Sequence, residues 1–180
     1  ATVAVHDNIK NRVTIAHVAD STAVMGKKTA ESASKLEGVK LTRDHKPWLE
    51  DERLRIERSG GSVGKANTRV YVKDKPYPGL NMSRSLGDIL GHSCGISCEA
   101  EVVEFDLSRD DQVLLLCSDG VWEFISPAEA VNLACSYKPT EAMAAAEALA
   151  QEAKERWLKE TEAEGKCVVD DITVLLAHLP

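Results

Sequence analysis

The chain has 180 residues, a hydrophobic fraction of 43% and a formal net charge of −7 at pH 7, which is typical of one globular domain or most of one. The negative charge argues against nucleic acid as an obligate partner, and no apolar run approaches the roughly 20 residues that span a bilayer. Five scattered cysteines indicate reduced thiols and an intracellular protein, cytoplasmic or nuclear.

The first part of the chain is predicted to be mostly strands. Residues 2–6 and 12–18 are strand-like runs around a polar turn, and together they predict a hairpin. Asp20-Ser21 interrupts the second run before residues 23–26 resume it, so an acidic residue stands at a strand break. An Asp-Ser pair at such a break is also an ordinary turn or bulge device.

A short charged helix is predicted over residues 50–59, with Leu54 and Ile56 facing inward and Gly60-Gly61 ending it. Residues 73–79 are charged and rich in proline, which indicates an exposed excursion. In the segment that follows, Arg84 could bind an anion, or it could pair with Asp88 if the segment is helical.

The most informative stretch is residues 113–126, VLLLCSDGVWEFIS. Its continuous apolar run at 113–117 is typical of a buried strand, and the run breaks at Ser118-Asp119-Gly120. A carboxylate at the end of a buried strand is costly unless it meets a cation, hydrogen-bond donors or water. Asp and Gly also fill ordinary turns, so this stretch alone leaves both interpretations open.

A second acidic site lies near the end of the chain. Residues 168–176 form another strand-like run, rich in branched residues, with Asp170 and Asp171 near its start. Two acidic strand ends in one domain suggest a shared cation site. Carboxylate ligands favour magnesium, manganese or calcium over zinc.

Between these two stretches the pattern is helical. A helix is predicted from Pro127 to about Ser136, and a longer one runs from Glu141 to about Glu162. The predicted inward face of the longer helix comprises Ala142, Met143, Ala146, Leu149, Ala150, Ala153, Trp157 and Leu158. Strands followed by helices and a final strand indicate an α+β class, with antiparallel sheet and helices on one face.

The chain carries seven landmarks in order: VADSTAV, LTRDHKP, ERLRIERSGGSV, RV, MSRSLGD, LLLCSDGVWEFIS and DDITVLL. In this order they resemble the metal-dependent, type 2C family of serine/threonine protein phosphatases, from the first residue to the last. The resemblance implies an antiparallel β-sandwich flanked by helices, with a binuclear metal centre at one edge of the sandwich.

The same resemblance implies a set of metal ligands. Asp119 and Asp170 match the ligand aspartates of the central pair of ions, and Asp171 stands where the family has an asparagine. Asp20 matches an aspartate implicated in a weaker third site, and Glu123 stands where the family has an aspartate that shares this site.

The implied reaction is the hydrolysis of phosphoserine and phosphothreonine in a phosphoprotein substrate. A water activated by two Mg²⁺ or Mn²⁺ ions, with a third ion in some members, attacks the phosphorus directly. No side-chain nucleophile is needed, which agrees with the absence of a Cys-x5-Arg signature in the sequence. The complete domain is expected to be a monomer.

The family carries an Arg, a Glu-Asp pair and an Asp-Gly-His-Gly motif in its N-terminal half, whereas this sequence has a single Asp-Gly, at Asp119-Gly120, and no His-Gly. Residues 1–180 are therefore expected to be the C-terminal half to two thirds of one phosphatase catalytic domain, with the N-terminal part missing. This chain alone is expected to have little or no activity. The alternative is a pseudophosphatase or partner-binding domain without turnover, and a calcium-binding structural domain is disfavoured because no EF-hand spacing is present.

Overall fold

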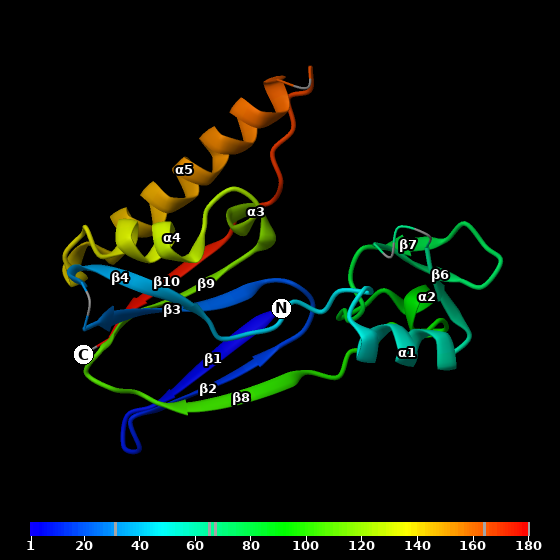
Figure 1. The fold of residues 1–180 in the computed structure, drawn as a ribbon, viewed down its shortest axis with the longest axis horizontal. Coiled ribbons are helices and arrows are strands. Elements are labelled where there is room, and N and C mark those ends of the chain that lie inside the picture. Colours follow the sequence, from blue (N-terminus) through cyan, green and yellow to red (C-terminus); the bar gives the residue numbers. More distant parts are fainter. Residues whose placement is uncertain (31, 65, 67, 164, 180) are drawn as a thin grey trace. The chain divides into compact units, whose positions relative to one another are not determined.

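The structure is a computed structural model that describes residues 1–30, 32–64, 66, 68–163 and 165–179 (Figure 1). Its class is α+β with antiparallel sheets, as the sequence predicts. The strands are β1 (Thr2–Asp7), β2 (Arg12–His17), β3 (Thr22–Thr29), β4 (Ser32–Lys40), β5 (Gly61–Val63), β6 (Val70–Val72), β7 (Pro78–Leu80), β8 (Glu101–Asp106), β9 (Asp111–Cys117) and β10 (Val174–His178). The helices are α1 (Glu50–Arg58), α2 (Ile89–His92), α3 (Asp119–Trp122), α4 (Pro127–Ala134) and α5 (Ala142–Ala163), with a 3₁₀ turn, η1 (Pro139–Glu141).

The chain divides into two compact units. Unit 1 comprises residues 1–5, 14–20 and 43–103, and unit 2 comprises residues 6–13, 21–42 and 104–180. The predicted hairpin forms the neighbouring strands of a three-stranded sheet with the order β1-β2-β8. Among the described residues, none of the helices is both long enough and apolar enough to cross a bilayer.

Unit 2 is built on a four-stranded antiparallel sheet with the order β10-β9-β3-β4. Strand β9 is buried along nearly its whole length, as its apolar run predicts. Cys117, its last residue, lies opposite Val174 at the start of β10 and Thr22 at the start of β3. The turn that follows β9 therefore lies at the edge of the sheet where β10 and β3 begin.

Helices α4 and α5 cover one face of this sheet (Figure 1). Helix α4 begins at a capping box, in which the backbone N–H of Glu129 donates to Ser126 Oγ and that of Ser126 donates to the Glu129 carboxylate. The core between sheet and helices contains Val24, Val113, Leu115, Cys117, Val121, Ile125, Ala130, Val131, Ala134, Leu149 and Ala153.

The predicted inward face of the long helix is correct in its middle and wrong at its start. Leu149 and Ala153 are buried, but Met143 is 73% exposed and Ala145 is buried instead. Ala145, Leu149 and Ala153 are spaced by four residues and so share one face. Met143 is two residues from Ala145, which places it about 200° around the helix, on the solvent side.

Unit 1 contains α1 and the antiparallel sheet β5-β6-β7, packed around Ile56, Val70, Cys94 and Ile96. The prediction for Ile56 is correct, and the helix ends before Gly60, whose φ of +82° suits glycine. The prediction for Leu54 is wrong, since Leu54 is exposed and Glu52 is buried. Glu52 and Ile56 are four residues apart and share the inward face.

Two further segments differ from expectation. The segment of Arg84 is not helical, and Arg84 bonds to Glu52 rather than to Asp88. Of the excursion predicted over 73–79, residues 73–77 are exposed and join β6 to β7, whereas Pro78 and Gly79 are half-buried in β7. The last strand begins at Val174 rather than at residue 168, so Asp170 and Asp171 lie in the segment that leads into β10.

Candidate metal centre

The turn after β9 and the segment before β10 are joined by three hydrogen bonds. Ser118 Oγ donates to the Asp171 carbonyl at 2.8 Å, and it accepts from the Thr173 N–H at 2.9 Å. The Ser118 N–H donates to the Thr173 carbonyl at 3.1 Å. These bonds hold together the residues adjacent to Asp119 and Asp170, and the two aspartate-bearing segments therefore lie at the same edge of the sheet.

Gly120 makes the close approach of the two segments possible. A Cβ atom at this position would lie 2.5 Å from the Asp171 carbonyl oxygen, which is closer than real Cβ atoms come. The Gly120 carbonyl accepts a 2.7 Å hydrogen bond from Trp157 Nε1 of α5. Asp119 thus stands on a turn that is fixed on one side by the segment before β10 and on the other by the long helix.

The partial or full exposure of these carboxylates is suitable for binding an ion that is accessible to solvent. Asp119 is half-buried, whereas Asp170 and Asp171 are exposed. The Asp171 N–H donates to Asp170 Oδ1 at 2.7 Å, which orients that side chain. The donors at this edge are carboxylate and carbonyl oxygens, the atoms that Mg²⁺ and Mn²⁺ prefer. The residues present therefore fit a hard divalent cation.

The two residues predicted for a third ion lie in different units. Glu123 follows Asp119 by one helical turn in unit 2, its N–H donates to the Asp119 carbonyl at 3.0 Å, and its side chain is exposed. Asp20 lies in unit 1, is 8% exposed, and forms an ion pair with Lys46 Nζ at 2.5 Å. The predicted role of Asp20 as a ligand stays a prediction.

The cysteine beside this turn is chemically inert. Cys117 is 2% exposed, and burial raises the pKa of its thiol to about 12. At neutral pH the thiol is therefore protonated and serves neither as a metal ligand nor as a nucleophile. All five cysteines are free thiols.

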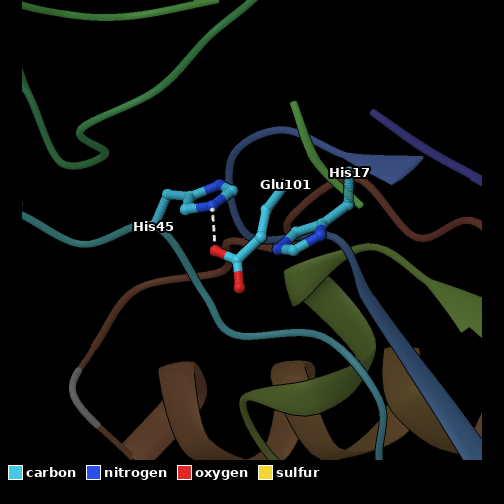
Figure 2. Close-up of side chains that lie close together, drawn as sticks. All are labelled: His17, His45 and Glu101. Atoms are coloured by element: carbon cyan, nitrogen blue, oxygen red, sulfur yellow. Dashed lines mark hydrogen bonds and ion pairs between the residues drawn. The ribbon is translucent and has the colours of Figure 1, made fainter. Parts of the chain in front are cut away.

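Sequence reasoning missed a second group of polar side chains, in unit 1. His17, His45 and Glu101 offer ligand atoms that all lie within 4.8 Å of one another (Figure 2). A signal for His17 was present, because Val13, Ile15 and His17 alternate along β2 and all three are buried. No local signal connects His17 to Glu101, since the two are far apart in sequence.

Comparison with known proteins decides the family. The family model described as "Protein phosphatase 2C" matches residues 1–161 of this chain. The chain belongs to the protein phosphatase 2C family. This agrees with the resemblance seen in the seven sequence landmarks.

The relatives within the protein phosphatase 2C family include plant proteins. The "Probable protein phosphatase 2C 72" of Arabidopsis thaliana is 34% identical over 170 residues, which cover 92% of this chain and 50% of the relative. The "Probable protein phosphatase 2C 12" of Oryza sativa subsp. japonica is 35% identical, over 79% of this chain and 37% of the relative. The chain thus spans about half or less of the length of these relatives.

A solved structure supports the same family. The crystal structure of a serine-threonine phosphatase 2C from Toxoplasma gondii matches with a TM-score of 0.77 and 28% identity, covering 94% of this chain and 55% of that chain. A C. elegans sex-determining protein matches with a TM-score of 0.74 but only 22% identity, and so it bears on the fold alone.

Proposed function

We propose that this chain contributes Asp119 and Asp170 to the metal centre of a serine/threonine phosphatase that hydrolyses phosphoserine and phosphothreonine in proteins. The observation that supports this most directly is the pair of hydrogen bonds through Ser118 Oγ, which hold the two aspartate-bearing segments together. Membership of the protein phosphatase 2C family supports the reaction class.

The ions of this centre are proposed to be Mg²⁺ or Mn²⁺. When bound, such ions lower the pKa of a coordinated water and offset the charge of the phosphoryl oxygens. The contribution of this chain is to hold the two aspartate-bearing segments together before the ions bind. Ser118 and Gly120 fix the spacing of the two segments, and the Trp157 indole anchors the turn from α5.

Asp20 and Glu123 are proposed as ligands of a weaker third ion. Asp20 forms an ion pair with Lys46, so a metal ion that binds Asp20 must compete with the Lys46 ammonium group. We therefore expect the third ion to bind only at higher metal concentration than the ions at Asp119 and Asp170.

The test is hydrolysis of a phosphothreonine peptide by the full-length protein in the presence of Mn²⁺. Asp119→Asn and Asp170→Asn should each lower kcat by about 100-fold or more, because loss of a ligand charge weakens the ion that stabilises the transition state. Asp74→Asn, at an exposed position of the 73–77 excursion, is the matched control and should leave kcat unchanged. Wild-type rates in both ligand variants would refute the proposed roles.

The 180-residue chain alone is proposed to have little or no phosphatase activity, since the resemblance assigns further ligands to an upstream segment. A phosphopeptide assay of the purified chain with Mn²⁺ checks this. Turnover comparable to that of the full-length protein would contradict it. A full-length protein that binds Mn²⁺ but shows no turnover would favour a partner-binding domain instead.

A further inference from the structure

Two buried histidines of unit 1 form a stacked pair that the proposed phosphatase centre does not use. His17 is the last residue of β2, and His45 lies in the loop before α1. The centroids of the two rings are 4.5 Å apart and the ring planes are 7° from parallel, with the residues 2% and 0% exposed (Figure 2). Two charged rings would repel each other at this distance, so the geometry suits neutral imidazoles.

The hydrogen bonds of His45 require a neutral ring. Its Nδ1 accepts from the Ala19 N–H at 3.2 Å, so the ring proton is on Nε2, which donates to Glu101 Oε2 at 3.2 Å. A second proton can be added only at Nδ1. The new N–H would face the Ala19 N–H, and because both groups are donors the hydrogen bond between them would be lost.

The bond to Ala19 matters because His45 holds this residue on two sides. The backbone N–H of His45 donates to the Ala19 carbonyl at 2.9 Å, while the His45 ring accepts from the Ala19 N–H. Ala19 has a φ of +76°, which residues with a Cβ atom rarely adopt and which persists only where the surrounding structure imposes it. Protonation of His45 therefore removes one of the two bonds by which it holds a strained residue.

His17 does not offer a favourable alternative position for the proton. Its Nε2 lies 2.8 Å from the Arg43 carbonyl oxygen, and because a carbonyl only accepts, Nε2 already carries a proton. Its buried Nδ1 has no hydrogen-bond partner among the described residues. A proton on Nδ1 would therefore create a buried N–H without an acceptor, which is unfavourable.

The charged groups around the pair do not compensate for its burial. Burial, and after it the charge of Arg84, lowers the pKa of His45 below its ordinary value of 6.5, and the carboxylates of Glu101 and Glu52 offset this only in part. Arg43 is bonded to Asp51 at 2.8 Å and to Glu101 at 3.4 Å. The folded chain therefore contains the neutral His45 ring at pH 7.

We propose that the His17–His45 pair is an acid-sensitive switch, in which the neutral His45 ring holds Ala19 against the loop before α1 and a proton added in mild acid opens this contact locally. The opened segment binds the proton more readily than the closed one, because the pKa of His45 is lowered only in the closed form. The closed form is therefore fully stable above about pH 6.5, and its stability falls as the pH decreases below that value.

The pH range separates this switch from the carboxylates of the same unit. The pKa values of Glu52 and Glu101 lie below 4.5 in the folded chain, so their stabilising contributions are lost only below about pH 4.5. A comparison of pH 7 with pH 5 therefore reports on histidine protonation.

The experiment measures hydrogen exchange of the Ala19 amide by NMR in the 180-residue chain at pH 7 and pH 5. Each rate is divided into the rate of an unstructured peptide at the same pH, which gives a protection factor. The factor should be about fivefold or more lower at pH 5, within the limit of tenfold per pH unit for one proton. His45→Asn provides an oxygen acceptor that does not titrate, so its protection factor should not change with pH. His6→Asn, at an exposed histidine of β1, is the matched control and should behave as the wild type.

The ring nitrogens of His45 give a second readout that needs no variant. Their NMR shifts at pH 7 should show a proton on Nε2 and none on Nδ1, and the ring should titrate below pH 6.5. Circular dichroism checks that His45→Asn is folded. The proposal is wrong if Ala19 protection in the wild type is the same at pH 5 and pH 7, if a folded His45→Asn chain shows the same fall, or if His45 is protonated at pH 7. None of these results bears on Mn²⁺ binding at Asp119 and Asp170.

Discussion

Burial in the fold lowers the reactivity of the Cys117 thiol. This residue lies directly before the Ser118-Asp119-Gly120 turn, and its burial raises the pKa of the thiol to about 12. We expect iodoacetamide at pH 7.5 to alkylate the exposed Cys98 and Cys167 and to leave Cys117 unmodified. Peptide mass spectrometry checks this, with a urea-unfolded sample as the positive control. Alkylation of Cys117 at the rate of Cys98 would contradict the buried position.

Glu52 is a buried carboxylate that the sequence pattern did not reveal. It is 1% exposed and accepts hydrogen bonds from Arg84, Arg55 and Ser83. Burial alone raises the pKa of Glu52, but these three partners outweigh it and lower the pKa from 4.5 to about 2. The Glu52 carboxylate is therefore ionised in the folded chain at neutral pH.

Replacing Glu52 should destabilise the chain. Glu52→Gln leaves two arginines without their buried counter-charge, and we expect the free energy of unfolding to fall by about 3 kcal/mol. Glu57→Gln is the matched control on the same helix, because Glu57 is half-exposed and its nearest cation, Arg53, lies 3.9 Å away, and it should cost less than about 1 kcal/mol. Urea unfolding measures both, and equal midpoints for the two variants would contradict the role of Glu52.

The same carboxylate predicts a pH dependence. Because the folded pKa of Glu52 lies below its ordinary value of 4.5, the ionised group stabilises the fold fully above about pH 4.5. This contribution is lost as the pH falls from 4.5 towards 2. The difference in unfolding free energy between wild type and Glu52→Gln should therefore shrink as urea unfolding is repeated at lower pH. A difference that stays constant down to pH 3 would contradict the lowered pKa.

At the scale of elements, the decisive contact is the one between the β9 turn and the segment before β10. Gly120→Ala places a methyl group 2.5 Å from the position of the Asp171 carbonyl oxygen, so the two segments must move apart. We expect a loss of about 1 to 3 kcal/mol in unfolding free energy. We also expect Mn²⁺ affinity to fall, since the two aspartates are separated. Thermal unfolding and Mn²⁺ titration measure the two effects, and unchanged Mn²⁺ affinity in a destabilised variant would argue against the shared edge.

The elements that the sequence predicts well are those whose patterns are local. The apolar run of β9 and the capping residues Ser126 and Pro127 of α4 specify their own structure, and both elements form where expected. The errors have non-local causes. Glu52 replaces Leu54 on the inward face of α1 because Arg84, from a distant segment, provides its counter-charge. Strand β10 begins later than its apolar run suggests. The backbone of Asp171 and Thr173 bonds to the Ser118 side chain rather than pairing with strand β9.

At the scale of the whole molecule, the family and the α+β class were predictable from the sequence, and the family model confirms the first. Their signal is a series of landmarks spread over the chain, so errors in single elements do not remove it. A shared cation site was predicted from the two acidic stretches, but nothing local in the sequence shows that Ser118 joins the two segments. The group of His17 and Glu101 was not predictable, because it depends on pairing distant parts of unit 1.

The central claim is that Asp119 and Asp170 belong to one metal centre. Isothermal titration of Mn²⁺ into the 180-residue chain tests it most directly, in parallel with the Asp119→Asn/Asp170→Asn double variant and with Asp74→Asn as the control. The account predicts saturable binding to the wild-type chain and to the control, and loss of that binding in the double variant. Equal binding isotherms for the wild-type chain and a folded double variant would contradict it.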